Sequence, residues 1–525
     1  MSHAQSEEHE TRARIALLWP KGFIANYSIP LALGYLKSNL EKARYDVRIY
    51  DCVLSNTDAS SAEVESFLRD FDPDVVGVST WSPMFPEALA LLRLAKNLNP
   101  KVHTVIGGAH ATSYFDRVMQ NPEIDFLFRG EADLSFAVLM DELQNTTPRF
   151  DLVKGLVYRK EEQLLQNDME RTPDLDTINI PDYEAIQLET YVKNGYRWNS
   201  PPRGNAPLWA TRGCPYRCQY CAAPELNGKP VRKHSIEYMV KWVTDLHQQR
   251  DARWFNIIDD NFTFDVKYAK AFCRAMIELK AQGVLSRDVG FGTPNGIRMQ
   301  RGDKELWSLM KQAGWKHLIV APESGSLSTL KLMKKDLKLE IVPKVVKEIR
   351  EAGLRVQAFF IIGYPGETPA DLEETAKLIR RCRFNFVFLA DFHPLPGTPV
   401  YDDLVRRGEI EDGLLPNNFS DGQRTYTAKE FENFNFSKFI LKMHLYLMLN
   451  DPMNIPYHLS VVFKLYSPKI VIKKLFFNIR GMLLSGASRK TESKFVPMHM
   501  QAQHLAPKEV SVSKVELVES LKTRD

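Results

Sequence analysis

Three of the chain's six cysteines stand between positions 214 and 221, in the stretch TRGCPYRCQYCAAPE. Cys214, Cys218 and Cys221 form a C-x3-C-x2-C loop, and cysteine thiolates bind soft metals and iron–sulfur clusters. A structural zinc ion would need four protein ligands, and no fourth cysteine lies nearby. A loop of three ligands leaves one metal corner open, which suits catalysis. A zinc site and three coincidentally buried thiols are the alternatives that this spacing leaves open.

The elements that must position this loop form a β/α alternation over residues 207–400. Six strand-like runs alternate with helical patterns: LWATRG (208–213), WFNIIDD (254–260), VGFGTP (289–294), HLIVAPES (317–324), VQAFFIIGYPG (356–366) and FVFLADFHP (386–394). Six units are too few for a closed eightfold barrel, so we expect an open (β/α)6 partial TIM barrel. In this architecture the chemistry belongs to the loops at the carboxyl ends of the strands.

Residues 10–146 show a separate β/α alternation. The strand-like runs are RIALLWP (14–20), DVRIYD (46–51), DVVGVST (74–80), KVHTVIGG (101–108) and IDFLFRG (124–130). This order predicts a Rossmann-like, doubly wound α/β domain, whose ligands lie at the carboxyl ends of the strands. The candidate ligand-binding residues at these ends are Ser79, Thr80, Gly107, Gly108, His110, Gly130 and Glu131. The first strand lacks G-x-G-x-x-G, so we expect a ligand other than a dinucleotide, or a purely structural sheet.

The remaining segments are less regular. Residues 147–206 are polar and rich in proline, which predicts a linker segment, and residues 401–490 predict a helical C-terminal domain. Residues 491–525 are expected to be a disordered tail. A stretch at 459–486 mixes lysines with apolar residues. Such a stretch can lie on a membrane surface or pack on the barrel with its lysines solvated, and both interpretations stay open.

Composition narrows the class of protein. The chain has 525 residues, 44% of them hydrophobic and 26% charged, as in an ordinary globular protein of two or three domains. A net charge of +4 gives no case for nucleic-acid binding. The polar start MSHAQSEEHETRAR lacks the apolar core of a signal peptide, and no run of about 18 apolar residues predicts a transmembrane helix. We therefore expect a cytoplasmic protein, with peripheral contact at the inner membrane face as the variant that the basic stretch allows.

The cysteine loop resembles the signature of the radical S-adenosylmethionine (SAM) superfamily, C-x3-C-x-aromatic-C, with Tyr220 in the aromatic slot. The resemblance implies a [4Fe–4S] cluster on the three cysteines, with SAM chelating the fourth iron and yielding a 5′-deoxyadenosyl radical. Later segments, IIDDNFT (257–263), PESGS (322–326), FFIIGYPGET (359–368) and HPLPGTPVYD (393–402), are similar to the family's strand-end motifs. They imply SAM contacts by Asp260, Asn261, Glu323, Ser324, Ile361 and Gly363.

An open α/β sheet before such a barrel resembles the cobalamin-binding domain of the B12-dependent radical SAM class. The segments GGAHAT (107–112) and RGEAD (129–133) look like that class's fourth and fifth strand ends. The D-x-H-x-x-G motif, which supplies a histidine to cobalt in other B12 proteins, is missing from residues 14–145. The resemblance therefore implies cobalamin without a protein histidine on cobalt. A sheet that has lost cobalamin is the alternative.

Together these resemblances imply an enzyme that methylates an unactivated carbon of a small-molecule or lipid-like substrate. The adenosyl radical would abstract hydrogen, methylcobalamin would deliver the methyl group, and a second SAM would restore it. The alternatives are an oxidative cyclase or ring-rearranging enzyme of the magnesium-protoporphyrin ester cyclase type, and a regulator without turnover. We expect a small-molecule substrate, in the lipid or tetrapyrrole range, and a reducing partner such as flavodoxin or ferredoxin. No catalytic acid or base is assigned.

Overall fold

The computed structural model describes residues 13–22, 29–169, 171–194, 204–413 and 426–465. Its first domain is built on a seven-stranded sheet. Its order is β2-β1-β3-β4-β5-β6-β7, and the first five of these strands are parallel. The strands are β1 (Ala13–Trp19), β2 (Tyr45–Asp51), β3 (Val75–Ser79), β4 (His103–Gly107), β5 (Phe126–Phe128), β6 (Leu156–Lys160) and β7 (Gln163–Gln166). The connection reverses between β1 and β3, where doubly wound sheets open their ligand crevice. The predicted Rossmann-like domain is confirmed.

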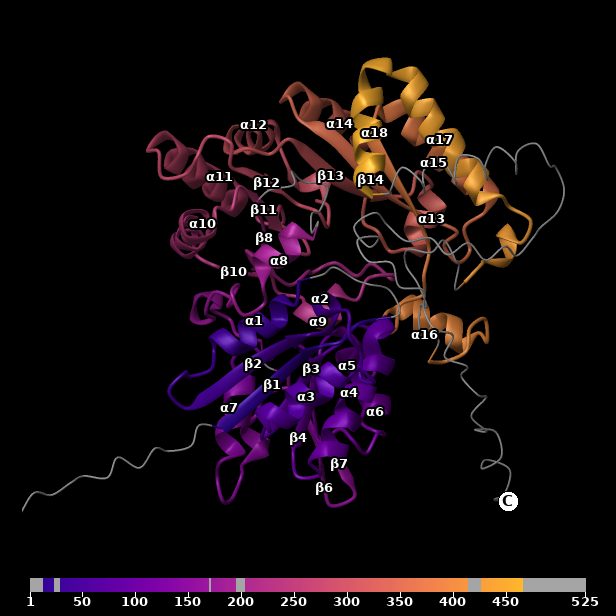
Figure 1. The fold of residues 1–525 in the computed structure, drawn as a ribbon. Helices are drawn as coiled ribbons and strands as arrows, with labels where there is room; N and C mark the ends of the chain where they lie inside the picture. Colours follow the sequence, from indigo (N-terminus) through magenta and orange to yellow (C-terminus); the bar gives the residue numbers. More distant parts are fainter. Residues whose placement is uncertain (1–12, 23–28, 170, 195–203, 414–425, 466–525) are drawn as a thin grey trace, which may run out of the picture.

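Helices cover both faces of this sheet, which explains why its central strands are apolar throughout (Figure 1). In β1, Ala16 and Leu18 belong to one apolar cluster, whereas Ile15 and Leu17 belong to another, so alternate residues serve opposite faces. The covering helices are α1 (Leu31–Ser38), α2 (Cys52–Ser55), α3 (Ala62–Phe71), α4 (Phe85–Leu98), α5 (Ala109–Ser113), α6 (Phe115–Val118) and α7 (Ser135–Glu142).

The segment predicted as a linker, residues 147–206, contains the hairpin of β6 and β7. Strand β6 pairs antiparallel with β5 and so extends the first sheet to Gln166. Only the start of β6 is buried, and β7 is largely exposed. The many prolines predicted a linker. The short hairpin of β6 and β7 was not predicted, because apolar and polar residues alternate only weakly in these strands. Helix α8 (Leu188–Lys193) follows in the same segment.

The second domain carries six parallel strands in two sheets of three. The sheets are β12-β11-β8 and β13-β14-β15, and a parallel bridge between Ile297 and Val320 joins them. The strands are β8 (Asn205–Leu208), β11 (Trp254–Ile257), β12 (Gly290–Gly292), β13 (His317–Glu323), β14 (Arg355–Ile362) and β15 (Phe386–Asp391). This is the open six-strand barrel that the sequence predicts. A two-stranded ribbon of β9 (Thr211–Arg212) and β10 (Arg232–Lys233) flanks the loop that carries the cysteines.

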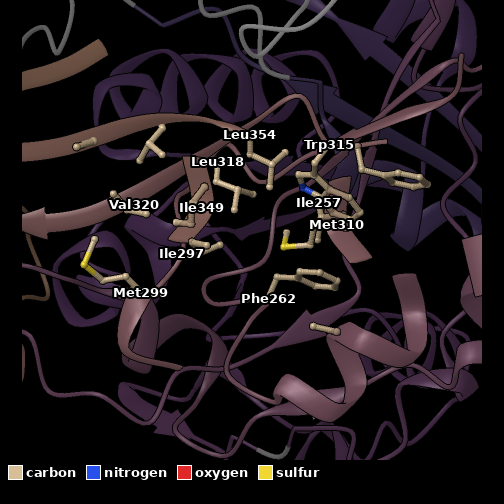
Figure 2. Packing of buried hydrophobic residues seen from close by; sticks show 14 of the residues in the cluster. Ile257, Phe262, Ile297, Met299, Met310, Trp315, Leu318, Val320, Ile349 and Leu354 are labelled. Atoms are coloured by element: carbon tan, nitrogen blue, oxygen red, sulfur yellow. The ribbon is translucent and has the colours of Figure 1, made fainter. Parts of the chain in front are cut away.

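A single apolar cluster joins the two barrel sheets to their helices. Figure 2 shows Ile257 of β11, Leu318 and Val320 of β13, Met310 of α12 and Ile349 of α14 within it. The helices are α9 (Ala223–Asn227), α10 (Ile236–Arg250), α11 (Val266–Ala281), α12 (Lys304–Ala313), α13 (Leu327–Leu332), α14 (Ile341–Glu351) and α15 (Pro369–Cys382). Most begin at a Ser, Thr or Asp that accepts a backbone hydrogen bond, which fixes where each strand-end loop stops.

The C-terminal part is helical over the described residues. Helix α16 (Pro399–Arg406) lies beside the first domain, whereas α17 (Phe436–Asn450) and α18 (Ile455–Leu465) cover the outer side of the barrel (Figure 1). Short 3-10 turns complete the fold: η1 (Ser82–Met84), η2 (Phe150–Leu152), η3 (Leu175–Thr177), η4 (Met299–Arg301), η5 (Lys429–Phe431) and η6 (Pro452–Asn454). Most of the basic stretch and the whole predicted tail lie outside the described residues. None of the described helices is long and apolar enough to span a bilayer.

Candidate functional site

The cysteine loop lies between β9 and α9, at the carboxyl end of the first barrel strand. Its backbone is fixed at both ends: the amide of Cys214 donates to the carbonyl of Gly228 at 2.9 Å, and that of Gln219 donates to Met333 at 2.9 Å. Gly213 has a φ of +100°, and a Cβ there would lie 2.2 Å from the carbonyl oxygen of Pro230. Only glycine can start the loop in this conformation.

All three cysteines are half-buried and unbridged. Burial raises the pKa of Cys221 to about 12, and the nearby Cys218 and Asp260 add to the rise. A nearby metal cation would stabilise the thiolate form of these side chains. Within the described residues, no group of three His, Cys, Asp or Glu side chains is arranged to hold a single metal ion, as a zinc site would require. The separate irons of a cluster accept thiolates that lie further apart than the ligands of one zinc ion.

Tyr220, the aromatic residue of the cysteine motif, connects this loop to the end of β13. The hydroxyl of Tyr220 donates to Glu323 Oε1 at 2.9 Å, and Lys335 Nζ donates to the same oxygen at 2.9 Å. Glu323 has a φ of +69°, an uncommon conformation outside glycine; the side chains of Glu323 and Lys335 are largely buried and Tyr220 is half-buried. Two residues predicted from separate motifs are thus in direct contact. Lys335 was not predicted from the sequence, because it lies twelve positions beyond Glu323 and belongs to no motif.

The second strand end supplies three polar residues with different surroundings. Asp259 accepts from the amide of Ala210 at 2.8 Å and from Thr211 Oγ1 at 2.7 Å, so it fastens β11 to the start of the loop. Asp260 accepts from Asn227 Nδ2 at 2.9 Å. Asn261 is buried, and neither its amide nitrogen nor its carbonyl oxygen has a partner within the described residues. An unpaired buried amide is costly, so Asn261 fits a residue that waits for a ligand.

The remaining predicted SAM residues lie at the ends of β13 and β14. Ser324 is fully buried and shares a hydrogen bond with Thr375 at 3.2 Å, so its hydroxyl is engaged within the protein. Ile361 is half-buried at the end of β14. Gly363 has a φ of +75°, and its amide donates to Glu367 Oε2 at 2.7 Å. The carboxylate of Glu367 therefore fixes the turn, while its Oε1 is buried without a partner within the described residues.

In the first domain, the residues predicted at the ends of β3 and β4 form one compact edge. Gly108 has a φ of +96°, and a Cβ there would lie 2.6 Å from the carbonyl oxygen of Thr80. Ser79 is buried beside them, and the amide of Thr80 donates to Gly107 at 2.9 Å. Over Gly107 the nearest atom is Phe128 Cβ, at 3.8 Å. The missing Cβ of Gly108 is therefore what lets the backbone of Thr80 pack so closely against it.

His110 takes a different position from the other residues of this edge. Its ring is buried against Phe85, with ring centroids 4.4 Å apart, and its Nδ1 shares a hydrogen bond with Ser82 at 3.1 Å. Burial lowers the pKa of His110 to about 4, so the ring is neutral at physiological pH. The aromatic side chain exposed at this edge is Trp81, 39% accessible and in edge contact with Trp19 at 6.1 Å.

Glu131 and Asp133, from the fifth strand end, face the second domain. Arg212 of β9 donates to both oxygens of Asp133, at 2.6 and 3.1 Å, and lies 3.4 Å from Glu131. Arg232 of β10 forms a bidentate pair with Glu131. The side chains of Arg212, Glu131 and Asp133 are only 1%, 8% and 11% exposed. These pairs hold the cysteine loop against the edge of the first sheet, and Gly130, with φ +73°, turns the chain toward them.

Comparisons with known proteins match both halves of this arrangement. The model of the B12 binding domain matches residues 23–140, and that of the radical SAM superfamily matches residues 210–379. The chain therefore contains a B12-binding domain followed by a radical SAM domain. Both halves of the resemblance seen in the sequence are thereby confirmed.

Curated relatives align over most of the chain. An uncharacterized methyltransferase of Pyrococcus horikoshii is 26% identical over 470 residues, covering 88% of this chain and 92% of its own. Cytidylyl-2-hydroxyethylphosphonate methyltransferase of Streptomyces wedmorensis is 27% identical, with coverages of 77% and 84%. The anaerobic magnesium-protoporphyrin IX monomethyl ester cyclase of Rubrivivax gelatinosus is 26% identical, with coverages of 77% and 70%.

The fold has counterparts of known structure. The radical S-adenosylmethionine methyltransferase TsrM from Kitasatospora setae, solved with cobalamin and a [4Fe–4S] cluster, aligns with a TM-score of 0.63. The alignment covers 76% of this chain and 78% of that one at 16% identity. The likeness shows that the order and packing of the two domains recur.

Proposed function

We propose that the chain is a cobalamin-dependent radical SAM methyltransferase that acts on an unactivated carbon of a small molecule. The observation that carries the proposal is the junction of two strand edges. A loop with three cysteine ligands ends the first barrel strand, and buried ion pairs hold it against the carboxyl edge of a B12-binding sheet. Two edges of ligand-binding type, facing one another, suit a reaction that needs two cofactors close together.

When bound, a cluster with SAM would supply radical chemistry for hydrogen abstraction, and cobalamin would supply the methyl group. Cys214, Cys218 and Cys221 would hold the cluster. The protein's own work is to keep this loop in one conformation. Gly213 starts it, Asp260 braces it through Asn227, and Tyr220 fastens it to β13. These contacts come from separate elements, so the cluster position is fixed before any ligand arrives.

SAM would lie over the carboxyl ends of the barrel strands. The unpaired amide of Asn261 offers a donor and an acceptor to its polar groups. The turn at Gly363 presents backbone, which Glu367 fixes from below. The pair of Glu323 and Lys335 orients Tyr220 at the cluster's edge. Ser324 supports this strand end from within rather than facing a ligand.

Cobalamin would lie on the edge formed by Ser79, Thr80, Gly107 and Gly108. Gly107 adds no side chain to this edge and has room above it, whereas Gly108 lets Thr80 pack closely against the chain and so keeps the edge compact. The buried neutral His110 packs beneath this edge and shares its Nδ1 with Ser82. We propose that His110 supports the edge from within the protein and does not bind cobalt.

The substrate is proposed only by chemical class. The relatives named above are named for a phosphonate and for a tetrapyrrole, so a polar small molecule and a large ring are both within the range of similar chains. A low-potential electron donor of the flavodoxin or ferredoxin type would supply electrons to the cluster. The oxidative cyclase is the second candidate, because such an enzyme aligns over 77% of the chain.

We also propose that the C-terminal helices contact a lipid surface. Leu449 and Met453, where α17 meets η6, are 76% and 91% exposed, and the sequence beyond α18 continues with lysines among apolar residues. Co-sedimentation with anionic liposomes would recover the full chain but not a chain ending at residue 465. Equal recovery of the two forms would contradict this contact and favour helices that pack on the barrel.

The function is tested by anaerobic reconstitution with iron, sulfide, cobalamin, SAM and a reductant. We expect 5′-deoxyadenosine from the wild type and none from the C214A/C218A/C221A variant. With candidate substrates, each methyl group delivered leaves one S-adenosylhomocysteine, whereas oxidative cyclisation leaves none. A cyclised product without S-adenosylhomocysteine would favour the cyclase. Cobalamin uptake without any cleavage of SAM would favour a regulator.

A further inference from the structure

Arg298 lies next to the cysteine loop although it belongs to another part of the barrel. It follows β12, and its neighbour Ile297 bridges to Val320 and donates its amide to the carbonyl of Ile319 at 2.8 Å. The backbone at this position is therefore held by β13. Arg298 is only 7% exposed, which is unusual for an arginine.

The guanidinium of Arg298 makes two contacts with the loop. It stacks on the ring of Tyr216, with its central carbon 3.3 Å from the ring centroid. Its Nη2 lies 3.7 Å from Cys218 Sγ, at hydrogen-bond distance for sulfur. Planar stacking and a directed N–H can be satisfied together by arginine, whereas lysine offers only a point charge.

The remaining donors of Arg298 point to an anion that the protein itself does not supply. Its Nη1 is buried and has no hydrogen-bond partner within the described residues. Among the ion pairs of those residues none involves Arg298, so its charge is buried without a carboxylate. Burying a lone cation is costly, and the sulfur it touches belongs to a predicted cluster ligand.

We propose that Arg298 is a positioning residue of the cluster, which holds Cys218 through an N–H···S bond and raises the cluster's reduction potential. The inference rests on the proposed function, since it requires a cluster on the three cysteines. Adding one electron makes the cluster more negative, and a nearby cation with a hydrogen bond to a ligand sulfur stabilises that reduced form. Arg298 thus makes the cluster easier to reduce by the electron donor.

The chain offers a matched control in Arg301. It is exposed, donates its Nε to the hydroxyl of the same Tyr216 at 3.2 Å and lies over Phe264, but it has no contact with a cysteine among the described residues. R301Q therefore removes a positive charge from the same loop without touching sulfur. R298Q removes the positive charge and the guanidinium that stacks on Tyr216. R298K keeps a positive charge but loses the planar guanidinium and its directed N–H groups.

The test is a redox titration of the reconstituted cluster, followed by the electron paramagnetic resonance signal of its reduced form. SAM is left out, so that weaker SAM binding cannot account for a change. We expect the midpoint potential to fall clearly in R298Q, to fall less in R298K and to stay at the wild-type value in R301Q. Iron content per chain is measured for every variant. Loss of iron from R298Q, with iron retained in R301Q, would also support the contact with Cys218.

Two results would overturn the inference alone. One is an R298Q cluster with wild-type potential, which would mean that Arg298 only packs against Tyr216. The other is an equal fall in the midpoint potential of R298Q and R301Q, which would mean that any positive charge near the loop has the same effect and that the contact with Cys218 adds nothing. A wild-type chain that assembles no cluster would instead overturn the proposed function and this inference with it.

Discussion

The buried ion pairs between the two domains can be tested by replacing Arg212 with methionine. The variant keeps most of the side-chain volume but leaves the carboxylate of Asp133 without its bidentate partner. Burial alone would lower the pKa of Arg212, yet Asp133, Tyr35 and Glu131 raise it above its ordinary value, so the guanidinium stays protonated. Arg212 also lies over the ring of Trp209 at 4.4 Å.

The expected magnitude follows from burial. With exposures of 1% and 11%, Arg212 and Asp133 are both largely removed from water. Removing one member of a buried pair costs about 3–5 kcal/mol, because the other charge stays buried and unpaired. The exposed pair of Arg14 and Asp72, with side chains 40% and 60% accessible, is the control. R14M should cost less than about 1 kcal/mol.

The assay is guanidinium unfolding followed by circular dichroism for wild type, R212M, D133N and the double variant. We expect each single variant to destabilise the chain strongly, and the double variant to be less destabilised than the sum of the two. That difference is the coupling between the side chains, and we expect about 2 kcal/mol. A loss below about 1 kcal/mol in R212M, or strict additivity, would refute the claim that this pair holds the domains together.

Three further predictions address single residues. G108A should abolish cobalamin uptake by equilibrium dialysis, because φ is +96° and a Cβ would lie 2.6 Å from Thr80 O, whereas G408A, with φ +67° and open space, should bind normally. N261A should leave the melting temperature of the apoprotein unchanged or higher, since its amide has no partner, but weaken SAM binding about tenfold in calorimetry; equal affinity would contradict its assignment. Burial raises the pKa of Glu367 to about 7, above its ordinary 4.5. The stability that the protonated side chain contributes is therefore full below pH 4.5 and lost as the pH rises through 7. E367Q should flatten the fall in melting temperature between about pH 5 and 8, and parallel melting curves of wild type and E367Q against pH would contradict this.

Much of the fold was predictable because short sequence patterns indicate its strands and turns. Buried parallel strands appear as short apolar runs, and the glycines at their ends mark turns that only glycine allows. The three cysteines lie close in sequence, so their grouping needed no structure. The strand ends that bring Tyr220 to Glu323 were predicted separately, and the barrel joins them.

The partners of individual side chains were not predictable, because they come from distant positions. Glu131 looked like a ligand-binding strand end, but two arginines more than 80 positions away engage it in the structure. Arg298 and Lys335 carry no local signal, since an arginine after a strand and a lysine after a helix are usually solvated. His110 is buried because Phe85 and Tyr114 pack around it, which periodicity cannot show.

The central claim is that one chain holds a cluster and cobalamin on two facing edges. The most direct measurement is anaerobic reconstitution followed by iron, sulfide and cobalt analysis of the gel-filtered protein. We expect about four irons and one cobalamin per chain for the wild type, and cobalamin without iron for the C214A/C218A/C221A variant. A wild-type chain that takes up iron but no cobalamin, or cobalamin but no iron, would contradict it.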